Sequence, residues 1–224
     1  MSFYMTEFIE LSHMIEDGMT TYTGLPGPII RDFLSRDVSR NHYAAGTTFQ
    51  IAKIEMVANT GTYIDAPFHR YEEGRDVSQL KIASVANLHG VVIHADKTIR
   101  AIRPEIFRDR DINEKAVLIH TGWDRHWGTG RYFDGYPYLT RESAESLKSA
   151  GAALVGIDSL NIDDNTEGTR PAHTILLGSE IPIVEHMRNL GALPDAGFRF
   201  FAVPAPVKGM GSFPVRAFAI INPS

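Results

Sequence analysis

The sequence contains no cysteine, and only two of its 224 residues are tryptophan. The absence of cysteine excludes disulfide bonds and thiolate metal sites, so a metal ion would have to be bound by histidine, aspartate or glutamate. No apolar run approaches the roughly 20 residues that a helix needs to cross a bilayer. The segment from Met1 to Glu10 also lacks the apolar core of a signal peptide. We therefore expect a cytoplasmic protein with no membrane partner.

Positive charge is scarce as well. The 22 Lys and Arg residues are outnumbered by 27 Asp and Glu residues, which gives a formal net charge of -5. Because no segment is rich in Lys or Arg, nucleic acid is not expected as a partner. Hydrophobic residues make up 43% of the chain, an ordinary value for a globular protein. With no internal repeat and no linker-like segment, the chain is expected to form a single domain over residues 1–224.

The hydrophobic pattern predicts an α/β fold. Strands are expected at residues 8–11, 49–57, 90–94, 116–120, 153–157, 198–203 and 215–221. The clearest helix spans residues 140–150, because Thr140 fits the N-cap and Gly151 the end of a helix. A shorter helix is expected to begin at Pro104, and further apolar faces lie at 174–177 and 183–190. The strand-helix-strand order of residues 116–157 favours a mixed sheet with flanking helices.

The segment from Asn59 to His69 carries polar residues through an otherwise apolar region. Polar groups in such a place must be paired, ligated or catalytic. Among the nine histidines, His69 and His173 are the two whose neighbourhoods call for a chemical explanation. His69 follows Asp65 by four residues and is predicted to act as a general base. The alternative for His69 is a bond to backbone groups of the turn at Pro67.

Several segments, in the same order along the chain, resemble the cyclase family, which includes bacterial kynurenine formamidases and isatin hydrolases. They are Leu11-Ser12-His13, the turn at Tyr22 to Pro26, Asn59 to His69, Thr121-Gly122-Trp123, Gly156 to Ser159, His173 to Glu185, and Pro214 to Ala217. The turn departs from the family's usual Tyr-Pro-Gly-Asp. The resemblance implies a swivelling β/β/α domain with a mixed central sheet, assembled as a homodimer or homotetramer.

The family pattern is His-x-Gly-Thr-His-x-Asp-x-Pro-x-His, and here Asn59 and Tyr63 replace the first two histidines. In the family, these histidines and the aspartate hold one zinc or manganese ion. The aspartate, a downstream histidine and a glutamate 12 residues beyond it can hold a second ion, and the last motif histidine is the general base. The resemblance therefore implies three metal ligands in this sequence, Asp65, His173 and Glu185, with His69 as the base.

The two replacements weaken the first metal site of the family. An asparagine oxygen is a weak, neutral ligand, and a tyrosine hydroxyl with an ordinary pKa of about 10 stays protonated near pH 7. Two bound ions are not expected, and either one zinc or manganese ion or no ion is compatible with the remaining residues. Tyr63 either assists catalysis, by donating to an oxyanion or protonating a leaving group, or fills the volume of the missing groups. Asn59 either orients a substrate carbonyl or stabilises the turn at Gly61.

Residues 123–138 form a loop dense in aromatic side chains. Trp123 and Trp127 are candidates for substrate binding, and the alternative is a packed surface flap. The Gly128-Thr129-Gly130 run lacks the strand and helix that flank a phosphate-binding loop. Asp158, which follows the predicted strand 153–157, is either a functional strand-end residue or a turn former.

The sequence thus predicts a hydrolase of a small amide, lactam or lactone, of the arylformamidase type, with His69 as base and at most one divalent metal. A metal-free lyase, dehydratase or cyclase that uses His69 and Tyr63 as an acid-base pair is one alternative. The other is a ligand-binding relative without catalysis. Its weakness is that the chain keeps Asp65, His69, His173 and Glu185, four polar groups that such a protein has no physical reason to retain.

Overall fold

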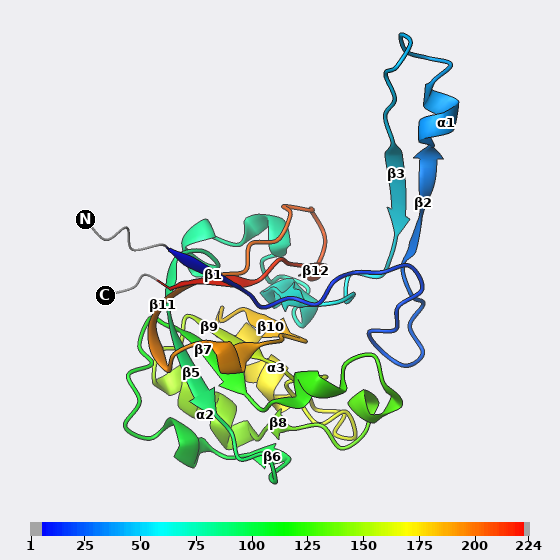
Figure 1. Cartoon of the computed structure of the whole chain (residues 1–224). Helices are drawn as coiled ribbons and strands as arrows, with labels where there is room; N and C mark the ends of the chain where they lie inside the picture. The colour runs from blue at the N-terminus through cyan, green and yellow to red at the C-terminus, as the bar shows by residue number, and fades with distance from the viewer. Residues whose placement is uncertain (1–5, 222–224) are drawn as a thin grey trace, which may run out of the picture.

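The computed structural model describes residues 6–221, so the first half of the segment Met1 to Glu10 lies outside the described residues. Its centre is a nine-stranded sheet whose strands follow the spatial order β1-β13-β11-β5-β7-β9-β10-β4-β12 (Figure 1). In that order the strands are Glu7–Glu10, Phe218–Ile221, Ala196–Phe201, Leu88–His94, Ala116–His120, Leu154–Ile157, Ile183–Glu185, Tyr63–Asp65 and Ser212–Pro214. The four strands β5, β7, β9 and β10 run parallel, and the remaining pairs are antiparallel. The predicted mixed sheet is confirmed.

The sheet separates two apolar cores. Side chains alternate between the faces of a strand, so Val91 and Ile93 enter one core while Val92 enters the other. The first core is closed by helices α2 (Arg141–Ser149) and α3 (Pro171–Leu177). The second core gathers side chains from both ends of the curled sheet, including Ile64 and Phe198. This arrangement explains why the central parallel strands read as continuous apolar runs.

Helix α2 forms as the sequence predicts. The side chain of Thr140 accepts a hydrogen bond from the backbone N–H of Ser143, and Ala150 is the C-cap. Gly151 follows with φ +76°, a left-handed conformation that glycine adopts at little cost. Capping residues and an apolar face at helical spacing are local signals, so this prediction needed no tertiary information.

Several expected elements differ in the structure; the strand expected at 215–221, for example, forms only over Phe218–Ile221. The helix expected at Pro104 is a single 3₁₀ turn, Pro104–Phe107. The strand expected at 49–57 is shorter, β3 at Ile51–Glu55, and β10 occupies only the first three residues of the apolar segment 183–190. Strands β4 and β12 are too short for periodicity to reveal, because three residues hold barely one alternation.

A small separate sheet joins β6 (Ala101–Ile102) to β8 (Tyr138–Leu139). The other 3₁₀ turns span Pro67–His69, Val77–Gln79, Ile82–Ser84, Trp123–His126, Gly130–Phe133 and Leu190–Ala192.

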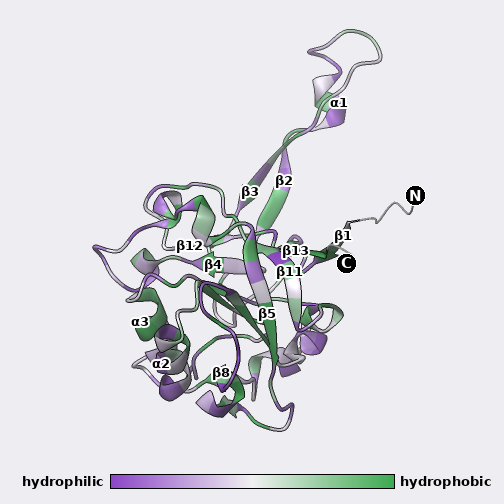
Figure 2. Cartoon of the chain, turned by 90° about the vertical axis from the view of Figure 1, so that its left-hand side faces the viewer, coloured by the Kyte–Doolittle hydropathy of each residue, from purple (hydrophilic) through white to green (hydrophobic). Residues whose placement is uncertain are grey.

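A narrow arm projects from the body of the protein (Figure 1). It consists of the antiparallel pair β2 (Ile29–Leu34) and β3, with the short helix α1 (Arg36–Ser39) at its far end. Hydrophobic residues occur along its strands as they do in the central sheet (Figure 2). On the arm, however, they are exposed: Phe33 is 77% and Ile51 50% accessible. In the described part of the chain, no helix is both long and apolar enough to span a membrane.

Candidate active site

Strand β4 lies between β10 and β12, and this neighbourhood brings the polar residues of the sequence motif together. In the register of these strands, Tyr63 is opposite Glu185 and Asp65 is opposite Ser212. Tyr63 and Asp65 are two residues apart, so their side chains share one face of the sheet. The turn before β4 is fixed by Gly61, which has φ +66°. Its N–H donates to the hydroxyl of Thr21 at 2.8 Å.

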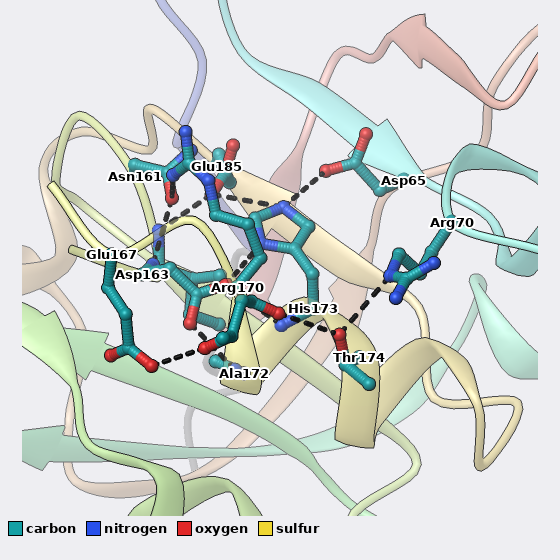
Figure 3. Close-up of polar contacts among 12 residues, drawn as sticks. Asp65, Arg70, Asn161, Asp163, Glu167, Arg170, Ala172, His173, Thr174 and Glu185 are labelled. Carbon is teal, nitrogen blue, oxygen red and sulfur yellow. Dashed lines mark hydrogen bonds and ion pairs between the residues drawn. The ribbon is translucent and has the colours of Figure 1, made fainter. Parts of the chain in front are cut away.

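His173 faces two carboxylates across the site. Its Nδ1 contacts the Asp163 carboxylate at 2.7 Å, and its Nε2 lies 3.6 Å from Asp65 Oδ2 and 3.7 Å from Glu185 Oε1 (Figure 3). Burial by itself lowers the pKa of His173, but the hydrogen bond to Asp163 and the nearby carboxylates of Asp65 and Glu185 outweigh it and raise the pKa to about 10. The same carboxylates would attract a cation, which could bind Nε2 only in place of this proton.

The residues present fit a divalent cation. The side chain of Asp65 is fully buried, and its Oδ2 has no hydrogen-bond partner among the described residues. Burial raises the pKa of Asp65, yet His69, His173 and Ser212 together hold it below its ordinary value, so the group is a carboxylate. Ligand atoms of Asp65, His69 and His173 lie within 4.8 Å of one another. This group contains the predicted ligands Asp65 and His173 and adds His69, whereas the third predicted ligand, Glu185, is not part of it and lies 3.7 Å from His173 Nε2.

Tyr63 is tied to one of these ligands. Its hydroxyl donates to Glu185 Oε2 at 2.5 Å, while the other glutamate oxygen accepts from the N–H of Ile162 at 2.7 Å. Burial and the charge of Glu185 raise the pKa of Tyr63 well above its usual value. Burial likewise raises the pKa of Glu185, to about 7. Tyr63 therefore remains a neutral phenol that orients Glu185, and its oxygen is not available as an anionic ligand.

Ser212 links three residues of the motif. Its hydroxyl contacts Asp65 Oδ1, His69 Nδ1 at 2.9 Å and Asn59 Nδ2 at 3.3 Å. A carboxylate only accepts hydrogen bonds and a hydroxyl has one proton, so Ser212 donates to Asp65. It must then accept from Asn59 and from Nδ1–H of His69. This arrangement selects the His69 tautomer whose Nε2 carries a free lone pair, as a general base requires.

A cavity of about 250 Å³ opens over these groups. Among the sequence-predicted site residues, Asn59, Tyr63, His69, His173 and Glu185 line it, whereas Asp65 does not. The other residues that line it are Tyr22, Leu25, Arg70, Asn161 and Arg170. The volume falls below the roughly 300–1,000 Å³ of most drug-sized ligand sites, which indicates a small substrate.

The two tryptophans do not line this cavity. Trp127 stacks on His13, with ring centroids 3.9 Å apart, and lines a different hollow. Trp123 is buried, and its indole N–H donates to the carbonyl oxygen of Tyr132 at 3.0 Å. Their substrate-binding role stays a prediction, and the position of the cavity does not favour it. Asp158 is also absent from the lining; it accepts three hydrogen bonds from Thr121 and Gly122 and so holds that turn.

Sequence reasoning missed Asp163 and Ser212. Asp163 is fully buried and accepts hydrogen bonds from the backbone N–H groups of Ala172 at 2.6 Å and His173 at 3.0 Å. A carboxylate ten residues before a candidate ligand histidine was the only signal in the sequence. Ser212 had no local signal, because only the pairing of β12 with β4 brings it beside Asp65.

Comparison with known proteins identifies the family. The cyclase family model, described as "Putative cyclase", matches residues 9–164. The chain belongs to the cyclase family. A kynurenine formamidase of Bacillus thuringiensis (strain Al Hakam) is 26% identical over 227 residues, covering 97% of this chain and 98% of the relative. One from Geobacillus thermodenitrificans (strain NG80-2) is 28% identical over 218 residues, covering 95% and 97%.

Solved structures agree with the fold. Isatin hydrolase A from Labrenzia aggregata, bound to benzyl benzoate, superposes with a TM-score of 0.83 at 20% identity and covers 97% of this chain and 94% of its own. An isatin hydrolase bound to the product analogue thioisatinate gives a TM-score of 0.82 at 18% identity, covering 97% and 93%. The α/β cyclase-family fold predicted from the sequence is thereby confirmed.

Proposed function

We propose that this cyclase-family protein is a hydrolase that cleaves the C–N bond of a small amide or lactam, or the corresponding bond of a lactone, with His69 as the general base. The observation that carries the proposal is the position of His173 Nε2, 3.6 Å from Asp65 Oδ2 and 3.7 Å from Glu185 Oε1, at a cavity that His69 also lines. Relatives that match nearly the whole chain are named as kynurenine formamidases. These names support the amide class.

Each residue of the site has a separate role in the proposed reaction. His69 Nε2 removes a proton from water, and the resulting hydroxide adds to the substrate carbonyl carbon. Asn59 uses one amide hydrogen on Ser212 and has a second that can be donated to the carbonyl oxygen. As the C–N bond breaks, the proton held by His69 passes to the departing nitrogen. A divalent cation bound by Asp65, His173 and Glu185 would supply a Lewis acid for the carbonyl and lower the pKa of the water.

The metal-free alternative needs Tyr63 as an acid opposite His69. The contact of the Tyr63 hydroxyl with Glu185 at 2.5 Å commits its proton to that carboxylate. Its raised pKa also makes it a weak acid near neutral pH. These two observations favour the hydrolase over a lyase, dehydratase or cyclase.

Metal content tests the proposal directly. We expect elemental analysis of protein purified without a chelating column to find about one zinc or manganese ion per chain, because one set of three ligands is complete. The double variant Asn59→His/Tyr63→His is expected to bind about two. A wild-type protein that contains no metal and still hydrolyses amides would contradict the assignment of Asp65, His173 and Glu185 as ligands.

We also propose that the protein is a homodimer or homotetramer. The arm leaves large apolar side chains in water, and apolar patches of this kind mark association surfaces. Sedimentation equilibrium of the wild-type protein is expected to give a multiple of the 24.9 kDa chain mass. The double variant Phe33→Glu/Ile51→Glu is expected to have a lower mass, closer to that of a single chain. Ile82→Glu is the matched control, since Ile82 is 72% exposed but lies outside the arm. A monomeric wild-type protein would refute the assignment.

A further inference from the structure

Two guanidinium groups line the cavity without an acidic partner. Arg70 and Arg170 both contribute to its wall, and within residues 6–221 neither takes part in an ion pair. The chemistry proposed above uses neither of them. A positive charge at a small polar cavity, in a chain with a net charge of -5, calls for a partner of opposite sign.

The guanidinium group of Arg170 is hydrogen-bonded through one nitrogen, Nη1, and its opposite edge makes no hydrogen bond within the described residues. Its Nη1 donates to the side-chain oxygens of Asn161, at 3.1 Å, and Asn165. Within the described chain, its Nε and Nη2 have no hydrogen-bond partner. The residue is the N-cap of α3, with φ +47°. A fixed guanidinium with a free edge presents two parallel N–H groups, the geometry that binds a carboxylate through both oxygens.

Arg70 brings a second positive charge to the same cavity. Its Nε donates to the hydroxyl of Thr174 at 3.2 Å (Figure 3). Its guanidinium lies over the ring of Tyr71, 5.2 Å from the centroid. These two contacts restrain the side chain, while both Nη groups have no protein partner in the part of the chain that the structure describes. Arg70 directly follows His69 in the sequence and lines the same cavity.

We propose that the substrate carries a carboxylate, which Arg170 binds through its free edge and Arg70 through its charge. This inference rests on the proposed hydrolase function and narrows its substrate to a small amide with an anionic end. Tyr22 and Leu25 provide an aromatic ring and an apolar side chain in the wall for the body of the molecule. Arg70 and Arg170 are thus specificity-determining residues.

Binding of benzoate and of its neutral analogue benzamide, measured by calorimetry, tests the charge recognition without any turnover. Wild type is expected to bind benzoate at least about 10-fold more tightly, because a hydrogen bond to a charged group is stronger than a neutral one. Arg170→Met and Arg70→Met should each remove most of this preference. Arg110→Met is the control, since Arg110 is exposed and lies outside the cavity lining. Equal binding of both compounds by wild type, or an undiminished preference in both cavity variants, would overturn the proposal.

Kinetics with formanilide and its ring-carboxylated isomers separate recognition from catalysis. For the best carboxylated isomer, Arg170→Met is expected to raise KM about 10- to 100-fold, while kcat/KM for formanilide stays within about twofold. Arg170→Lys keeps the charge but not the paired N–H groups. Its KM for the carboxylated isomer should lie between the values of wild type and Arg170→Met. An equal loss for both substrates would indicate a structural role and overturn the proposal. Absence of turnover with every anilide would refute the amide hydrolase function, whereas the benzoate measurement would still decide the carboxylate site.

Discussion

Replacing His69 with alanine is expected to lower kcat about 10²- to 10⁴-fold, the usual contribution of a general base. The expectation follows from the contact of its Nδ1 with Ser212 at 2.9 Å, which leaves Nε2 free to take a proton from water. Steady-state kinetics with an amide substrate would measure the loss. Because the side chain of His69 is 37% exposed, the variant should fold normally, and its thermal unfolding checks this.

Two further measurements distinguish the roles of His69. Ser212→Ala removes the group that selects the His69 tautomer but keeps the base. It should therefore lower kcat by a smaller factor than His69→Ala does. Metal content of His69→Ala decides between base and ligand, since its ring lies within ligand distance of Asp65 and His173. Full metal occupancy with lost turnover is the expected result. Loss of the metal together with activity would instead make His69 a ligand, and unchanged turnover would remove it from the mechanism.

Asp163→Ala is expected to weaken metal binding about 10- to 100-fold, the usual effect of removing the residue that orients a ligand histidine. The Asp163 carboxylate holds His173 Nδ1 at 2.7 Å and also accepts two backbone N–H groups at the start of α3. Without it these buried donors lose their partner, at a cost of about 1–3 kcal/mol for each group that stays unsatisfied. Chelator competition and urea denaturation would measure the two effects separately.

Asp164→Ala is the matched control for this prediction. Asp164 is the next residue along the chain, and its carboxylate accepts hydrogen bonds from Thr166, outside the site. We expect this variant to keep the wild-type metal affinity. The metal affinity of Asp163→Asn should lie between those of Asp163→Ala and wild type, because an amide oxygen can still accept from one donor. If Asp163→Ala binds metal as tightly as the control, Asp163 does not orient His173 as a metal ligand.

The sequence by itself determined the fold class and predicted the position of the candidate site. Strand 116–120 and helix 140–150 carry strong local signals, namely a short apolar run and a capped amphipathic face, and both form where predicted. The motif from Asn59 to His69 marked the site and the family because its spacing is local. The lack of cysteine already limited metal ligands to His, Asp and Glu.

The tertiary structure decided which distant residues complete the site. Ser212 lies 147 residues from Asp65 in the chain and reaches it only through the pairing of β12 with β4. Arg170 and Arg70 share one cavity because the loop before α3 and the turn after β4 meet there, and the same packing places Trp127 elsewhere. Strand register and loop packing depend on contacts between remote segments, and local periodicity carries no information about them.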